Sequence, residues 1–140
     1  MASHARQPYI RIQWFLKRKE GMSPEHFHAY WAKEHADFAL SLPGFKQIAK
    51  RYTQYQEKAK VLGLPLIVGS DGQPFDGTAE MLVESVEEYV KHMSQDEIVQ
   101  AIIKDAANFM GEGAHVMVGY ETLQLGEPVP GLPKDNHFRL

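Results

Sequence analysis

The order of secondary-structure signals repeats once along this chain, and this repetition restricts the folds that it can form. Alternating apolar and polar residues predict strands, whereas apolar residues three or four positions apart predict helices. The predicted strands are residues 9–17, 45–55, 78–84 and 115–123, and the predicted helices are residues 23–42, 86–93 and 94–110. Each half of the chain is thus a β-α-β unit of similar length. Two such units predict an α+β fold in which four antiparallel strands form one sheet with the helices on one face.

This arrangement is the ferredoxin-like βαββαβ fold, and its best-marked boundary is the start of the first helix. Ser23, Pro24 and Glu25 supply an N-cap hydroxyl, a proline at the first helical position and an acid in the first turn. The Pro-Gly pair at residues 43–44 ends this helix. A second signal, SQDE at residues 94–97, predicts a capping box that opens the last helix.

We expect a single domain over residues 1–123, followed by a tail. A chain of 140 residues is long enough to bury one proper core. Residues 56–77 combine a short helical pattern at 57–62 with closely spaced glycines and prolines, which predicts a long loop that acts as a lid. The tail, residues 124–140, is rich in proline and glycine and has no periodicity.

The first predicted strand has apolar residues on both faces. By alternation, Ile10, Ile12, Trp14 and Leu16 share one face, and Phe15 lies on the other. Because the helices cover only one face of such a sheet, the second face needs a partner. A second copy of the chain is the simplest partner, so we expect a homodimer.

The composition excludes several classes of protein. The chain has no cysteine, which excludes disulfides, thiolate chemistry and cysteine-based metal centres. Its net charge of −3 and its dispersed lysines and arginines argue against nucleic-acid binding. The longest apolar run is too short to cross a membrane and no signal peptide is visible, so a cytoplasmic protein is expected.

Neither a metal nor an organic cofactor is expected. The chain has seven histidines, but His26 and His28 do not share a helix face, and His28 and His35 are two turns apart. No glycine motif that binds phosphate is present. The chemistry is therefore expected to use side chains alone.

His35 lies within the apolar stripe of the helix predicted over residues 23–42. On a 3.6-residue period it follows Trp31 by one turn and precedes Phe38. An imidazole in such surroundings can serve as a general acid or base near neutral pH. It can equally be a core histidine with both nitrogens hydrogen-bonded, and spacing alone leaves both alternatives open.

Further candidates follow from their places in the predicted elements. Asp105 lies at the edge of the apolar face of the last helix, either as a boundary charge or as the partner of a cation in a pocket. His115 begins the last strand and is a second candidate for catalysis. The candidate binding residues are aromatic or hydrogen-bonding side chains on elements that would enclose a pocket: Trp14, Trp31, Phe38, Tyr52, His92 and Phe109. Flat apolar walls suit a planar polycyclic ligand, although most aromatic residues at helical spacing are core residues.

Two segments carry a resemblance to a known family. KRKEGMSPEHFHAYWAKEHADFALSLPGF, residues 17–45, resembles the opening motif of EthD-type proteins of the dimeric α/β-barrel superfamily, and FDGTAEMLVES, residues 75–85, resembles their third strand. With the order of elements, the resemblance covers nearly all of residues 9–123. It implies a dimer, and it places His35 at the position of the family's helix-1 histidine.

The loop over residues 56–77 is most similar to that of fungal members in aromatic polyketide pathways, which are regarded as cofactor-independent decarboxylases. The resemblance therefore implies a lyase. From His35 and the aromatic stripe we form the hypothesis that His35, with Asp105 or His115, protonates the ring carbon that bears a carboxylate. Related barrels catalyse cyclisation, dehydration or cofactor-free oxygenation, and a non-catalytic binder of a polyketide intermediate would use the same pocket. The fold alone does not choose among these functions.

Overall fold

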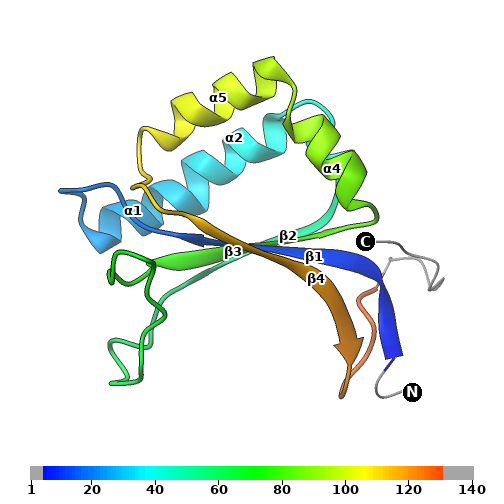
Figure 1. The fold of residues 1–140 in the computed structure, drawn as a ribbon. Coiled ribbons are helices and arrows are strands. Elements are labelled where there is room, and N and C mark those ends of the chain that lie inside the picture. The colour runs from blue at the N-terminus through cyan, green and yellow to red at the C-terminus, as the bar shows by residue number, and fades with distance from the viewer. Residues whose placement is uncertain (1–4, 131–140) are drawn as a thin grey trace.

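The computed structural model describes residues 5–130, and its centre is one four-stranded antiparallel sheet (Figure 1). The strands are β1 Ala5–Leu16, β2 Ala49–Gln56, β3 Gly77–Val83 and β4 His115–Leu123. They lie in the order β2-β3-β1-β4, so the two central strands come from different halves of the chain. The two β-α-β units therefore share one sheet, and the predicted α+β ferredoxin-like fold is confirmed.

The helices lie on one face of this sheet, and Figure 1 shows them above it. The first helical region consists of α1 Pro24–Tyr30, a π-helical turn η1 Trp31–His35 and α2 Ala36–Ser41. A one-turn helix, α3 Phe45–Ile48, precedes β2, whereas α4 Val86–Met93 and α5 Asp96–Ala106 follow β3. Within residues 5–130, no helix lies on the opposite face of the sheet, and we call it the helix-free face.

The helix predicted over residues 23–42 is confirmed, with one change in its geometry. The Ser23 hydroxyl accepts a hydrogen bond from the backbone N–H of His26 at 3.1 Å, and Pro24 follows in the first turn. The middle of the helix, η1, is π-helical, so its backbone hydrogen bonds span five residues instead of four. This wider turn changes the direction of the side chains that follow it, and His35 is its last residue.

Two elements of the connecting regions differ from the prediction. The strand predicted over residues 45–55 begins only at Ala49, because Gly44 adopts a φ of 76° and the chain first makes the turn α3. Within that turn the N–H of Ile48 donates to the carbonyl of Gly44 at 3.2 Å. The helical pattern at residues 57–62 forms irregular turns instead of a helix.

The predicted capping box at residues 94–97 is also wrong. The N-cap residue of α5 is Gln95, and its side chain makes no capping hydrogen bond. A serine does cap the preceding helix, since the Ser85 hydroxyl accepts a hydrogen bond from the N–H of Glu88 at 3.2 Å. Helix α5 ends at Ala106, and turns continue the chain to residue 109.

The core lies between the sheet and the helices in two adjoining clusters. The first is formed by buried residues of β1, β3, α4, α5 and the α2–α3 region: Ile10, Ile12, Leu42, Phe45, Met81, Val83, Tyr89 and Ile98. The second lies below α1 and η1 and consists of Leu16, Phe27, Trp31, Ala79 and Phe109. A Cβ on Gly77 would come within 2.6 Å of the Trp31 ring, so a glycine at this position allows η1 to pack close to the sheet.

Asp76, just before β3, joins the two segments that carry the family resemblance. Its carboxylate accepts hydrogen bonds from the backbone N–H of Arg18 at 2.8 Å and from the Arg18 guanidinium at 2.6 Å. Its carbonyl is 3.1 Å from Nε2 of His28 on α1, and its N–H donates to the carbonyl of Leu16 at 2.8 Å. The end of β1, the start of β3 and α1 are thereby fixed relative to one another.

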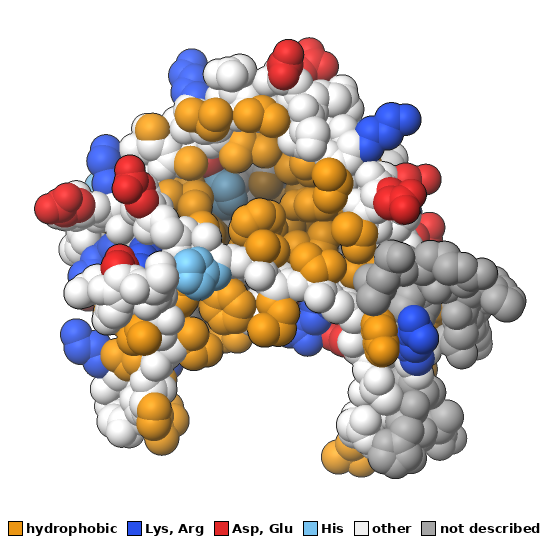
Figure 2. All heavy atoms as spheres, viewed as in Figure 1, with side chains coloured by type: hydrophobic (Ala, Val, Ile, Leu, Met, Phe, Trp, Pro, Cys, Tyr) orange, Lys and Arg blue, Asp and Glu red, His pale blue; other side chains and the backbone are white. Residues whose placement is uncertain are grey.

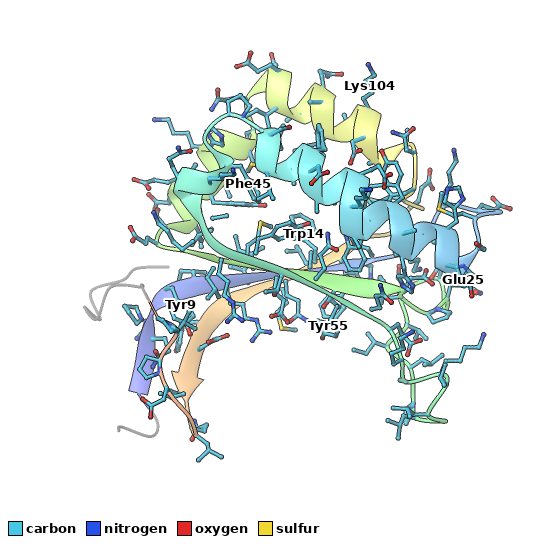
Figure 3. All side chains as sticks on the ribbon, turned by 180° about the vertical axis from the view of Figure 1, so that it is seen from behind. Tyr9, Trp14, Glu25, Phe45, Tyr55 and Lys104 are labelled. Atoms are coloured by element: carbon cyan, nitrogen blue, oxygen red, sulfur yellow. The ribbon has the colours of Figure 1, made fainter. Side chains whose placement is uncertain are left out.

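The helix-free face is polar at its centre and apolar at one end. Arg11 pairs with Glu80 and with Glu121, and the hydroxyl of Tyr9 donates to Glu121. Figure 3 shows the labelled side chains of Tyr9 and Tyr55 on this side of the sheet. Beyond the strands, the loop over residues 57–76 projects below the sheet (Figure 1) and carries five apolar side chains that are 50% to 82% exposed: Val61, Leu62, Leu64, Ile67 and Val68.

The predicted lid role of this loop is not supported by its position, since it lies below the sheet and away from the helices (Figure 1). Lys17 fixes the loop by pairing with Asp71, and its ammonium lies 5.2 Å from the centre of the Phe75 ring. The described part of the predicted tail, residues 124–130, has neither helix nor strand, and residues 131–140 lie outside the described residues.

Candidate active site

A cavity of about 210 Å³ lies between the helices and the sheet. Its walls come from β1, β3, α2, α4, α5 and the segment before β4, and they are formed mainly by apolar side chains: Trp14, Leu16, Phe38, Ala39, Leu42, Phe45, Ala79, Met81, Tyr89, Met93, Ile102, Met110 and Ala114. Figure 2 shows this hollow with a rim of hydrophobic side chains and a histidine inside it. His35 and Tyr52 complete the lining, and the hydroxyl of Tyr89 is a further polar group, which interacts with the side chain of Trp14.

His35 is held by a carboxylate from another helix. Its Nδ1 lies 2.5 Å from Oδ2 of Asp105 on α5, and the two side chains are only 19% and 8% exposed. The ring of Phe109 packs on the imidazole with 4.8 Å between ring centres. Asp105 is therefore the partner of a group in the cavity, which decides between the two alternatives that the sequence left open for it.

Further hydrogen bonds fix Asp105. Its Oδ1 accepts from the hydroxyl of Tyr30 at 2.7 Å, and the amide of Asn108 donates to the same hydroxyl at 3.0 Å. Burial, followed by the hydrogen bond to Asp105, raises the pKa of Tyr30 above its usual range, so Tyr30 keeps the proton that it donates.

This network determines which nitrogen of His35 is available to a ligand. Because both oxygens of the Asp105 carboxylate act as acceptors, Nδ1 of His35 carries the proton that lies between the two residues. Within residues 5–130, Nε2 has no hydrogen-bond partner, and the imidazole lines the cavity. Nε2 is therefore the atom that can exchange a proton with a molecule in the cavity.

Tyr52 on β2 supplies another polar group of the cavity. Its hydroxyl accepts a hydrogen bond from the side-chain amide of Gln54 at 2.8 Å. Burial raises the pKa of Tyr52, the hydrogen bond from Gln54 opposes this rise, and the charge of Asp105 adds to it, so the net pKa is above the usual value. Tyr52 is therefore a neutral hydrogen-bonding group near neutral pH.

The structure brings together most of the site residues named from the sequence. Trp14 and Phe38 line the cavity with His35 and Tyr52, and Figure 3 shows Trp14 between the sheet and the helices. Trp31 and Phe109 are fully buried and belong to the second core cluster instead of lining the cavity. Phe109 supports the imidazole of His35 from this cluster. For these two residues the expected wall position is wrong.

His115 lies on the other side of the sheet from His35. It pairs with Phe15 in the β1–β4 register, so both side chains point to the helix-free face. Its ring contacts Phe75 at 5.1 Å between ring centres. The expected position of His115 in the pocket is therefore wrong, because the alternation of a strand does not by itself tell which face is inward.

His92 is also outside the cavity. It belongs to the last turn of α4, and Nε2 makes a short contact with the carbonyl of Pro43, while Nδ1 is 3.2 Å from the amide of Gln95. Both ring nitrogens are thus used to join α4 to neighbouring turns. The structure gives His92 a packing position and no contact with the cavity.

Three residues of the site were not singled out from the sequence: Tyr30, Gln54 and Asn108. Asn108 follows Asp105 by three residues, a spacing that places two side chains on the same side of a helical turn. Tyr30 and Gln54 gave no comparable signal, because their partners are remote in sequence or contact them through the backbone.

Among residues 5–130, no group of three histidine, aspartate or glutamate side chains is placed to hold a metal ion. The same part of the chain contains no helix that is long and apolar enough to cross a membrane.

Comparison with protein-family models gives a match to the EthD domain over residues 19–113, which is more than half of the chain. The chain belongs to the EthD domain family. The matched region of this EthD protein includes α1, η1, α2, β2, β3, α4 and α5, and therefore both members of the His35–Asp105 pair. No curated protein sequence matches the chain.

Solved structures of the same fold include relatives that differ widely in sequence. An EthD family protein from Bacillus halodurans has 19% identity and a TM-score of 0.53, over 81% of this chain and 99% of that one. A hydroxynitrile lyase from Passiflora edulis has 12% identity and a TM-score of 0.57, over 84% and 97%. A dimeric protein with a ferredoxin-like fold from Bacteroides fragilis has 10% identity and a TM-score of 0.53, over 81% and 97%. At these identities the likeness shows the fold.

Proposed function

We propose that this EthD protein is a cofactor-independent lyase that removes the carboxylate of an aromatic polyketide carboxylic acid. One observation carries the proposal: Nε2 of His35, an imidazole held by a buried carboxylate, is available at the wall of an apolar cavity. A solvated surface histidine or a histidine with both nitrogens bonded would not have this arrangement.

The proposed reaction is a proton transfer followed by cleavage of a carbon–carbon bond. The imidazolium of His35 donates its Nε2 proton to the ring carbon that bears the carboxylate. The bond to the carboxylate then breaks, its electron pair returns to the ring, and CO2 leaves. His35 regains a proton from solvent, so the net reaction consumes one proton and releases one CO2.

The surroundings of His35 favour both steps. The negative charge of Asp105, 2.5 Å from Nδ1, stabilises the positive imidazolium before the transfer. The apolar walls stabilise neutral CO2 better than the carboxylate from which it forms. Trp14, Phe38 and Tyr52 provide flat surfaces for a planar polycyclic ring system. The Passiflora protein, named as a lyase, is an example of lyase chemistry in this fold.

The acting unit is proposed to be a homodimer joined through the helix-free face. Met117 and Tyr55 on this face are more than half exposed, and Tyr55 lines a groove together with Ile67 of the apolar loop. The Bacteroides structure of the same fold is described as dimeric. Light scattering checks this part of the proposal, and the mass of a single chain in solution would contradict it.

The reaction is tested by incubating the protein with a polyhydroxylated anthraquinone carboxylic acid and determining the product by mass spectrometry. Loss of CO2 is expected. Loss of water, an unchanged mass or a gain of oxygen would instead identify dehydration, cyclisation or oxygenation, and ligand binding without any product would identify a non-catalytic binder.

The role of His35 is tested with the substitution His35→Gln. We expect the rate to fall by about 10²–10⁴-fold, the contribution typical of a positioned general acid. The matched control is His115→Gln, which removes an exposed histidine on the opposite face and should leave the rate unchanged. Full activity of the His35 variant would contradict the proposal.

A further inference from the structure

Gln54 makes an unusual pair of hydrogen bonds beside the cavity. Its side-chain amide nitrogen donates to the backbone carbonyl of Trp31 at 3.0 Å and to the hydroxyl oxygen of Tyr52 at 2.8 Å. Tyr52 and Gln54 are two residues apart on β2, so they share a face of the sheet. An amide nitrogen has two hydrogens, and both are used in this arrangement.

These bonds determine the direction of the Tyr52 O–H group. Since the Tyr52 oxygen accepts a hydrogen from Gln54, its own proton must point away from Gln54. No residue among 5–130 accepts this proton, and Tyr52 lines the cavity. Tyr52 borders both this cavity and an open groove that Gln54 also lines. The Tyr52 hydroxyl therefore has one unused donor, and a proton that points away from Gln54 can be directed into the cavity.

The anchor of Gln54 is part of the same turn that carries His35. Trp31 is the first residue of the π-helical turn η1, and His35 is its last. One five-residue turn thus holds the imidazole directly and directs the tyrosine hydroxyl through Gln54. Two polar groups of the cavity are fixed relative to each other by this turn.

We propose that Tyr52 and Gln54 form a subsite for a carbonyl oxygen, in which Gln54 directs the Tyr52 O–H toward a ketone or quinone oxygen of the ligand. Gln54 acts here as a positioning residue, and Tyr52 makes the contact. The inference rests on the proposed function only in using the same cavity, and it adds that the ligand carries an acceptor oxygen in its ring system. Burial keeps the pKa of Tyr52 above its usual value, so the donor remains protonated across the neutral range.

Two probes of the same shape test this subsite, anthraquinone-2-carboxylate and anthracene-2-carboxylate. They differ in the two ring carbonyls, and binding of each is measured by isothermal titration calorimetry. We expect the wild type to bind the quinone about fivefold to tenfold more tightly, the effect of one additional net hydrogen bond. The substitution Tyr52→Phe should abolish this preference and leave the affinity for the anthracene probe unchanged.

Gln54 is tested by two substitutions with different effects on the tyrosine hydroxyl. Gln54→Met removes the directing hydrogen bonds, so the preference for the quinone should fall by roughly half or more. Gln54→Glu replaces the donor with an acceptor, which draws the Tyr52 proton away from the cavity and should remove the preference. Unchanged binding of the anthracene probe shows that each variant has kept the cavity.

The matched control is Gln13→Met. Gln13 donates to Tyr55 at 3.3 Å on the helix-free face, so its substitution breaks the same kind of bond away from the cavity. The proposal is overturned if the wild type binds both probes equally or binds neither, or if Tyr52→Phe and Gln54→Glu keep the preference. These binding experiments measure no turnover. A protein that prefers the quinone probe but releases no CO2 in the reaction assay would therefore contradict the proposed reaction and still support the subsite.

Discussion

The two faces of the sheet contain similar sets of polar groups, yet only one of them forms a candidate active site. On the helix-covered face, Asp105 accepts from the hydroxyl of Tyr30 and pairs with His35. On the helix-free face, Glu121 accepts from the hydroxyl of Tyr9 and pairs with Arg11. A carboxylate between a tyrosine and a nitrogen base is therefore present twice.

The difference lies in the nitrogen base and in its surroundings. A guanidinium keeps its proton at all physiological pH values, whereas an imidazole can gain and release one near neutral pH. Arg11 is moreover held between two carboxylates, Glu80 and Glu121, which raise its pKa. The groove lined by Glu80 and Glu121, the two partners of Arg11, measures about 80 Å³, compared with about 210 Å³ for the cavity beside His35. A buried carboxylate thus indicates acid–base chemistry only where its partner can exchange a proton with a ligand in an enclosed cavity.

The largest expected effect distinguishes the two carboxylates. Asp105→Asn replaces an acceptor of the His35 proton with an amide that can donate, so the imidazole loses its required tautomer. We expect the rate of CO2 release to fall by roughly 100-fold or more. Glu121→Gln makes the same chemical change on the helix-free face and should leave the rate unchanged. Both variants must first show the thermal stability of the wild type. An equal loss of rate in the two variants would then contradict the proposed difference between the faces.

A smaller effect is expected from filling the cavity. Ile102 on α5 lines it, whereas the adjacent Ile103 points to solvent and is 57% exposed. Ile102→Trp should weaken binding of the aromatic substrate by roughly tenfold or more, because the added ring occupies the space of the ligand. Ile103→Trp adds the same ring outside and should bind normally. Calorimetric titration with the substrate compares the two, and normal binding by the Ile102 variant would place the ligand elsewhere.

The smallest effect concerns stability at high pH, and here the two faces should behave alike. Burial raises the pKa of Tyr52 on one face and of Tyr9 on the other above the value of 10.0 for an exposed tyrosine. The unfolded chain therefore loses these protons at a lower pH than the folded protein does. Stability should be constant below about pH 10 and fall above it, by roughly 1 kcal/mol per pH unit for each tyrosine.

Urea unfolding between neutral pH and about pH 11 measures this decrease. Tyr52→Phe and Tyr9→Phe should each make the decrease shallower, since each removes one group that ionises only after unfolding. A stability that rises above about pH 10 would contradict the assigned direction for both residues.

The sequence predicted the features that depend on local signals. The Ser23 cap, the order of strands and helices and the apolar stripe around His35 follow from spacing along one element, and the structure contains them. His35 was identified with Asp105 as one of two alternative helpers. Their contact at 2.5 Å could not be predicted, because it depends on how two helices 70 residues apart cross.

Other features have no local signal at all. Periodicity showed that Trp31 and Phe109 lie on apolar faces, but it does not tell whether an apolar residue contacts other side chains or empty space. The face of the sheet to which His115 points depends on the register of β4, which the pairing with β1 determines. The predicted capping box at residues 94–97 does not form, because α5 begins one residue later than a cap at Ser94 would require and Gln95 takes the N-cap position.

The π-helical turn has a consequence for anyone who redesigns or transplants this helix. Winding the same residues Trp31–His35 as a regular α-helix, in which each residue advances by about 100° around the axis, would remove the extra residue that the wider turn accommodates. The segment beyond the turn would then be rotated relative to α1 by about that angle. An idealised helix of the same composition would carry every required side chain and still hold the imidazole out of reach of its carboxylate.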